Sequence, residues 1–152
     1  MNNIKSAAQL RQQIFDRNLD VEKCSGIYRW WFPKGIAENL LAHLKSQMSR
    51  NGQKLQERSI GGAPYLALYF GISCNMRRRV RWHICGPFTS STLRRTLRAI
   101  IAPDVDEETA EKVVNEMIDS CFWEWEYTES AKLAEENETE DLAQNKYAYP
   151  LN

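Results

Sequence analysis

Four side chains in the middle of this 152-residue chain combine types that can bind a phosphate and move protons beside it. Tyr28 ends a Ser-Gly-Ile-Tyr segment at 25–28, and Tyr69 begins a Tyr-Phe-Gly-Ile-Ser segment at 69–73. Arg79 follows Tyr69 by ten residues, and His83 follows Arg79 by four. An arginine is always charged and offers a planar fork to phosphate oxygens, whereas a phenol and an imidazole can exchange protons.

Two predicted strands would carry the tyrosines. Residues 25–32 and 65–72 are rich in β-branched and aromatic side chains and are bounded by turn residues, as strands are. Because successive side chains of a strand point to opposite faces, Tyr69 is expected to share a face with Ala67 and to point toward a cleft. Phe70 would then point the other way and fill the core.

A predicted helix would carry the arginine and the histidine. Asn75 is a suitable N-cap, and the helix is expected to run to about Cys85. Arg79 and His83 stand at i and i+4 and therefore lie on one face, which is free to meet a phosphate. A separate apolar stripe can pack on the sheet and is formed by Met76, Val80 and Ile84.

Together these segments resemble the signature of the GIY-YIG nucleases. Arg79 has the spacing of the family's catalytic arginine, and His83 stands where several members carry a catalytic histidine. The resemblance implies an α+β fold with a small three-stranded, mostly antiparallel sheet flanked by helices, here with an extra N-terminal helix and helical insertions. It also implies metal-dependent hydrolysis of DNA phosphodiester bonds. In that reaction Tyr28 would be the general base or orient the water, Tyr69 and His83 would hydrogen-bond around it, and Arg79 would bind the scissile phosphate.

The C-terminal end extends the resemblance. The family closes its core with a metal-binding glutamate and a proline-containing segment, in a pattern like E-x(6)-Y-x(2)-P-L-N, which here runs from Glu140 to Asn152. The resemblance implies that Glu140 holds one Mg²⁺, for which Mn²⁺ can substitute, and that Asn152 binds phosphate or braces the site. Glu138 and Glu136 are the alternative metal ligands if the register is shifted.

The charge of the chain is divided at Pro103. Residues 1–103 hold 17 Lys and Arg against 5 Asp and Glu, a net +12, whereas residues 104–152 hold 3 against 15, a net −12. A cationic face beside an acidic flank would confine binding to one side, although the acidic part can also be the solvated faces of helices. DNA is the expected partner, RNA is not excluded, and a homodimer for double-strand cleavage is left open. The candidate nucleic-acid contacts are Arg77, Arg78, Arg81, Arg94 and Arg95, of which the last two could instead pair with the predicted acidic helix at 106–116.

The rest of the chain shows no internal repeat. Residues 1–24 are predicted to form an N-terminal helical extension, with its helix at 6–18, and residues 25–152 a single GIY-YIG-like nuclease domain. Further elements are expected as helices at about 35–50, 93–102, 104–119 and 129–147 and as strands at 55–60 and 122–127.

Cysteine usage and hydropathy bound the setting of the protein. None of the four cysteines forms a C-x-x-C pair, so we expect reduced, mostly buried thiols, with a zinc site at His83 and Cys85 as the less favoured interpretation. The longest apolar run, 65–72, is too short to span a bilayer, so no membrane partner is expected. The N-terminal stretch lacks the apolar region of a secretory signal, which predicts a cytoplasmic location.

A second function class stays open beside the nuclease. The same fold could be a catalytically inactive module that binds nucleic acid or a partner, because Phe70 replaces the usual aliphatic residue and the glutamate register is uncertain. In favour of the enzyme, Tyr28, Tyr69, Arg79 and His83 are all present.

Overall fold

A single antiparallel sheet forms the centre of the protein. The computed structural model describes residues 3–44, 55–130, 132 and 149–152. In these residues the strands are ordered β1-β5-β2-β4-β3 in space, and each neighbouring pair is antiparallel. The elements are β1 (Asn3–Ser6), α1 (Ala7–Phe15), β2 (Gly26–Pro33), α2 (Lys34–Leu44), β3 (Glu57–Ile60), β4 (Ala63–Ser73), α3 (Met76–Cys85), η1 (Phe88–Ser90), α4 (Thr92–Ile101), α5 (Glu107–Asp119) and β5 (Phe122–Tyr127). The α+β class is confirmed.

The prediction of three strands was too low, because two short strands complete the edges of the sheet. The predicted strands β5, β2 and β4 occupy its centre. Strand β3, expected as a short strand at 55–60, pairs with the start of β4 through a turn at Gly61 and Gly62, whose φ angles are 60° and 83°. Strand β1 was missed, because four half-buried residues are too few to show an alternating pattern. Ser6 ends β1 and caps α1 in a capping box with Gln9.

Most predicted helices lie close to their expected positions, with ends set by their caps. Asn75 accepts from the backbone of Arg78 at the start of α3, as expected. Helix α5 begins at Glu107 rather than at residue 104, because Asp106 is its N-cap. Helix α1 ends at Phe15, short of the predicted residue 18. The predicted helix at 129–147 and the end of the one at 35–50 lie largely outside the described residues.

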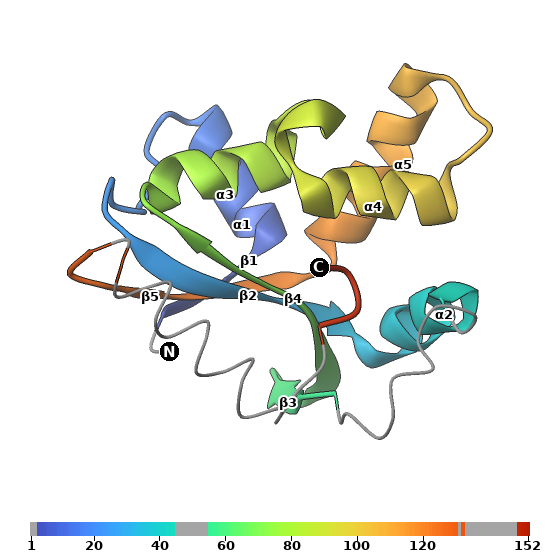
Figure 1. Cartoon of the computed structure of the whole chain (residues 1–152), viewed down its shortest axis with the longest axis horizontal. Helices are drawn as coiled ribbons and strands as arrows, with labels where there is room; N and C mark the ends of the chain where they lie inside the picture. The colour runs from blue at the N-terminus through green and yellow to red at the C-terminus, as the bar shows by residue number, and fades with distance from the viewer. Residues whose placement is uncertain (1–2, 45–54, 131, 133–148) are drawn as a thin grey trace.

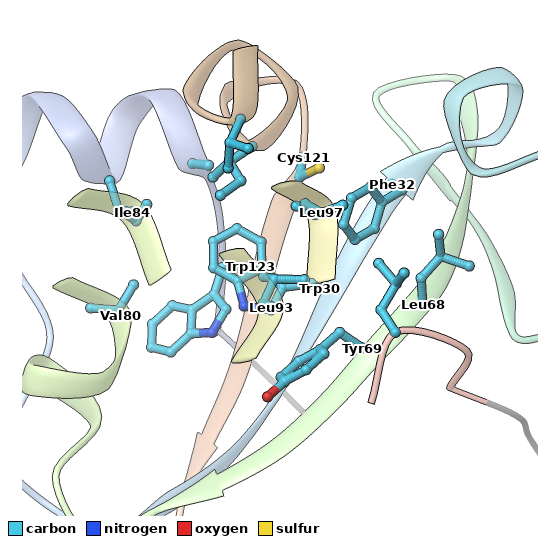
Figure 2. Packing of buried hydrophobic residues seen from close by; sticks show 14 of the residues in the cluster. Trp30, Phe32, Leu68, Tyr69, Val80, Ile84, Leu93, Leu97, Cys121 and Trp123 are labelled. Carbon is cyan, nitrogen blue, oxygen red and sulfur yellow. The ribbon is translucent and has the colours of Figure 1, made fainter. Parts of the chain in front are cut away.

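Four helices cover one face of the sheet. Figure 1 shows α1, α3, α4 and α5 on that face, whereas α2 lies at the end of the sheet near β2 and β4. Large aromatic residues of the strands meet aliphatic residues of the helices in the main core, and Figure 2 shows Trp30 and Trp123 close to Val80, Ile84, Leu93 and Leu97. Each fully buried side chain of this size contributes about 1.5–3 kcal/mol, so this packing fixes α3 and α4 against the sheet.

A β-bulge in β4 changes which face its side chains occupy. Tyr69 pairs with Trp30 but Ala67 pairs with Trp31, so Leu68 is an extra residue on β4. Leu68 and Tyr69 therefore both join the core under the helices, whereas Ala67 and Phe70 join a smaller cluster on the opposite face. The expectation that Tyr69 and Phe70 point apart agrees with this arrangement, but Tyr69 lies buried in the main core and not in a cleft. The expectation that Tyr69 shares a face with Ala67 is wrong, because strict alternation does not survive a bulge.

The cysteines are less buried than predicted. All four are free thiols, but only Cys121 is buried, while Cys24 is half-buried and Cys74 and Cys85 are exposed. Burial raises the pKa of the Cys121 thiol and, with the help of Glu22, that of Cys24. In the part of the chain that the structure describes, none of the helices has the length and apolar character needed to cross a membrane.

Candidate functional site

Strand β2 and helix α3 bring a tyrosine and a histidine into direct contact. Tyr28 Oη lies 2.8 Å from His83 Nε2, and the two side chains are 2% and 0% exposed. Tyr28 stands opposite Gly71 of β4, and its ring lies directly over that glycine. A Cβ atom at residue 71 would lie 3.0 Å from Tyr28 Cε1 and closer still to the hydroxyl. Glycine at this position therefore makes room for the phenol.

Aromatic rings enclose the Tyr28–His83 pair. The ring of Tyr69, released to this face by the bulge, is stacked 6.2 Å from that of Tyr28 and lies edge-on 5.5 Å from His83. Trp30 lies 5.8 Å from the imidazole, and Trp123 lies 5.9 Å from the Tyr28 ring. The indole nitrogens of both tryptophans are buried without a hydrogen-bond partner among the described residues. The pair is therefore held in a largely apolar setting, in which hydrogen bonds are strong.

His83 is neutral at physiological pH. Burial, followed by the positive charges of Arg79 and Arg94, lowers the pKa of its imidazole from 6.5 to about 3. Both ring nitrogens are engaged, Nε2 with Tyr28 and Nδ1 with Ser91 Oγ at 2.8 Å. The zinc site considered for His83 and Cys85 does not form, because neither ring nitrogen is available. The described residues also contain no group of three His, Cys, Asp or Glu that could hold a metal.

Arg79 lies on α3, one turn before His83, as the i, i+4 spacing predicts. Its side chain is half-buried, and the guanidinium carbon lies 5.4 Å from the centre of the Trp82 ring. Its Nε atom is buried and has no hydrogen-bond partner among the described residues. A partly desolvated guanidinium with an unused donor is suited to an anion, since charge-assisted hydrogen bonds to phosphate are strong.

Arg94 does not lie on the surface, which is inconsistent with its predicted contact to nucleic acid. The side chain is 0% exposed, and its Nη1 donates to Ile84 O at 3.1 Å, to His83 O at 3.4 Å and to Asn115 Oδ1 at 2.8 Å. On α5 the guanidinium of Arg94 contacts the side-chain amide of Asn115, and not a carboxylate as the alternative prediction of an ion pair required. Arg94 therefore satisfies carbonyls at the end of α3 and fixes α3 against α5.

The other candidate arginines lie nearer the solvent. Arg78, Arg81 and Arg95 are exposed, whereas Arg77 is half-buried and donates from Nε to Val21 O at 2.5 Å. A hollow of about 360 Å³ lies along one side of α3, from its N-cap to its C-cap. Its lining includes four cationic side chains and no carboxylate and consists of Lys23, Asn75, Arg77, Arg78, Arg81, Trp82, Cys85 and Gly86. This basic hollow is a candidate surface for a polyanion.

The last residues of the chain are attached to β4 beside the bulge. Leu151 N donates to Leu68 O at 2.9 Å. The amide of Asn152 pairs with the backbone of Phe70, accepting from its N–H at 2.9 Å and donating to its carbonyl at 2.7 Å. Both ends of this amide are thus used next to Tyr69, an arrangement that favours bracing over phosphate binding. Glu140 and its alternatives, Glu138 and Glu136, lie outside the described residues.

Two residues of this site had no role in the sequence-based prediction. Gly71 was noted only as part of a motif, although a glycine inside a strand signals a close approach of other atoms. Ser91 directly precedes α4 and is its N-cap. Its second contact, to His83, depends on how α3 and α4 pack, so no local pattern could have revealed it.

Comparison with known protein families gives a match over most of the chain. A family model described as the GIY-YIG catalytic domain matches residues 26–152, from the start of β2 to the last residue. The match includes Tyr28, Tyr69, Arg79 and His83. No curated protein and no solved structure matched the chain.

Proposed function

Because the chain belongs to the GIY-YIG catalytic domain family, a nuclease family, we propose that it is an endonuclease that hydrolyses DNA phosphodiester bonds at the site around Tyr28. The observation that carries this proposal is the 2.8 Å contact between Tyr28 Oη and the neutral His83, one helical turn from Arg79. A phenol held by an imidazole, together with a cation that has an unused donor, is suited to water activation at a phosphate.

Tyr28 is the group that handles the attacking water. Its hydroxyl orients the water or takes a proton from it, while His83 and the stacked ring of Tyr69 fix the position of the phenol. A free phenol has a pKa of about 10, so Tyr28 needs a neighbouring positive charge to act as a base near neutral pH. Arg79 supplies one such charge.

Arg79 binds the scissile phosphate. As the water attacks phosphorus and the 3′-oxygen departs, negative charge grows on the non-bridging oxygens, and a fixed guanidinium stabilises it. Asn152 contributes indirectly by holding the Phe70 backbone next to Tyr69.

Members of this family generally use a divalent metal, and we propose Mg²⁺, with Mn²⁺ as a substitute, held by Glu140. A single carboxylate fits this ion, because Mg²⁺ usually keeps several waters and takes only one or two protein carboxylates. The lack of a three-residue metal cluster in the described residues is compatible with that coordination. When bound, the ion would neutralise charge on the phosphate and the departing oxygen.

The DNA would cross the face that carries the basic hollow, where Arg77, Arg78 and Arg81 contact phosphates on one side of the scissile bond. Arg95, exposed on α4, extends the positive surface. One site cuts one strand, so double-strand cleavage would require a homodimer or two encounters. RNA, which carries the same phosphate backbone, is the second substrate to be tested.

One observation favours an inactive binding module instead. Tyr28 and His83 are almost fully enclosed, and an enclosed phenol does not meet a water without rearrangement. In that case the basic hollow would bind nucleic acid and no bond would be cut.

Cleavage of supercoiled plasmid with Mg²⁺ or Mn²⁺ distinguishes the two functions. We expect nicking by the wild type, loss of nicking in chelator and in Arg79→Ala, and normal nicking by Lys112→Ala, which removes an exposed cation from α5. Single Glu140→Ala, Glu138→Ala and Glu136→Ala variants, each checked for fold by circular dichroism, identify the metal ligand. A folded wild type that binds plasmid, branched DNA and RNA but cuts none of them would refute the enzyme and leave the binding module.

A further inference from the structure

A buried chain of hydrogen bonds connects the start of α4 to Tyr28. The backbone N–H of Arg94 donates to Ser91 Oγ at 3.2 Å, Ser91 Oγ lies 2.8 Å from His83 Nδ1, and His83 Nε2 lies 2.8 Å from Tyr28 Oη. Ser91 and His83 are both 0% exposed. The directions of these bonds decide where the imidazole proton resides, because neutral histidine carries one hydrogen on only one of its two nitrogens.

The N-cap bond fixes one direction. A backbone N–H can only donate, so Ser91 Oγ is the acceptor of the Arg94 N–H. The serine hydroxyl then needs an acceptor for its own hydrogen. Among the described residues, the partners of Ser91 Oγ are the Arg94 N–H and His83 Nδ1, so Nδ1 is the acceptor within reach.

The opposite tautomer leaves this chain incomplete. With the hydrogen on Nδ1, Ser91 Oγ would accept two hydrogen bonds, and its own hydrogen would find no acceptor among the described residues. Buried hydroxyl groups rarely remain in that state. With the hydrogen on Nε2, the Ser91 hydroxyl donates to Nδ1 and Nε2–H donates to Tyr28 Oη, and the hydroxyl hydrogen of Tyr28 then points to a group other than His83. The first donor of the chain also belongs to the positive N-terminal end of a helix, which polarises the bonds in the same sense.

We propose that Ser91 is a positioning residue that holds His83 as the Nε2–H tautomer, so that His83 donates to Tyr28 Oη and does not accept a proton from it. This assignment rests on the proposed function only for its catalytic meaning. In that setting His83 stabilises negative charge on the Tyr28 oxygen, and the hydrogen between the two residues stays on Nε2 throughout. Any proton that Tyr28 loses must therefore leave by another route than His83.

Nitrogen-15 NMR of imidazole-labelled protein tests the tautomer without any activity measurement. His43 is the only other histidine and is exposed on α2, so in a His43→Gln background all imidazole signals come from His83. We expect a protonated Nε2 and a non-protonated Nδ1. The reverse pattern, with hydrogen on Nδ1, would overturn the proposal directly.

Three substitutions at residue 91 test whether the serine sets the tautomer. Ser91→Thr keeps a hydroxyl and should keep the wild-type tautomer. Ser91→Asp keeps an N-cap acceptor but offers no hydrogen when ionised, so His83 should move its hydrogen to Nδ1. Ser91→Ala removes both functions and should give a mixture of tautomers. A wild-type pattern in folded Ser91→Asp and Ser91→Ala proteins would show that Ser91 has no positioning role.

Kinetics of the same variants connect the tautomer to catalysis. If the protein cuts DNA, we expect kcat of Ser91→Asp to fall by about tenfold or more with little change in KM, and Ser91→Thr to stay near the wild type. Unchanged kcat in an Nδ1–H variant would refute the catalytic role of the tautomer. If no variant cuts DNA and the wild type shows Nε2–H, the proposed function fails while the assignment of Ser91 and His83 stands.

Discussion

The neutral, buried His83 makes the stability of the fold depend on pH. Its imidazole has a pKa of about 3 in the folded state, because of burial and of the nearby charges of Arg79 and Arg94, and about 6.5 when unfolded. Between these values the unfolded chain binds a proton that the folded chain does not. The contribution of His83 to stability is therefore fully present above pH 6.5 and is lost as the pH falls through the window from 6.5 to 3.

The binding of one proton by the unfolded chain sets how steeply the free energy of unfolding falls with pH. Each pH unit in the window changes the free energy of unfolding by about 1.4 kcal/mol, so lowering the pH from 6.5 to 5 should remove about 2 kcal/mol. Small domains have a total stability of about 5–15 kcal/mol, so this is a measurable share. The pKa of Asp106 is lowered by the Thr109 backbone N–H at the start of α5. The stability that this carboxylate contributes is lost only below its ordinary pKa of 3.8, so it does not change between pH 7 and pH 5.

Urea unfolding between pH 7 and pH 5 measures the effect. The wild type and His43→Gln should both lose about 2 kcal/mol across this range, because His43 is exposed on α2 and its removal leaves His83 in place. His83→Gln should show a nearly flat profile over the same range, whatever its stability at pH 7. Equal pH slopes for the wild type and His83→Gln would refute the conclusion that His83 is held neutral by its surroundings.

Three further predictions concern single substitutions. Gly71→Ala should displace the Tyr28 ring, lower the free energy of unfolding by about 1–3 kcal/mol in chemical denaturation and abolish plasmid nicking, since the added Cβ meets the phenol; nicking at the wild-type rate would contradict this. Asn152→Ala should remove both hydrogen bonds to Phe70, cost about 1–2 kcal/mol in the same assay and reduce kcat more than it raises KM. Arg94→Met should lower the free energy of unfolding by about 3 kcal/mol, because buried acceptors lose their donor. Arg95→Ala should leave that stability within about 0.5 kcal/mol, but it should weaken DNA binding and lower its salt dependence, as measured by fluorescence anisotropy. Similar melting temperatures for the two variants would refute the distinction.

Strands with strong local patterns could be predicted from the sequence, and the edges and irregularities of the sheet could not. Strands β2, β4 and β5 are aromatic, β-branched runs bounded by turn residues, and they lie where expected. Strand β1 gains its structure by pairing with β5, because four residues have too little pattern of their own. The bulge at Leu68 likewise depends on pairing, here with β2 and with the C-terminal segment, whose Leu151 donates to the Leu68 carbonyl.

For the two neighbouring arginines of α4, the spacing of apolar residues predicts burial or exposure better than the charge does. Arg94 lies between Leu93 and Leu97 on the buried side of the helix, whereas Arg95 is exposed. Positive charge suggested the same role for both residues. The apolar spacing of the two leucines already indicated which arginine would turn inward, since neighbouring helical positions differ in direction by about 100°.

The apolar surroundings of the Tyr28–His83 pair give the contact with Ser91 its importance. In water a neutral imidazole exchanges its hydrogen between the two nitrogens through solvent, and a single hydroxyl would have little influence on the result. Trp30 and the ring of Tyr69 lie against His83, which is fully buried, so the hydrogen bonds of the protein alone determine the tautomer. The same enclosure lowers the pKa of the imidazole and so removes the charged form, in which both nitrogens would donate. The aromatic core of the sheet therefore acts on the chemistry of Tyr28 as directly as the residues that touch its hydroxyl.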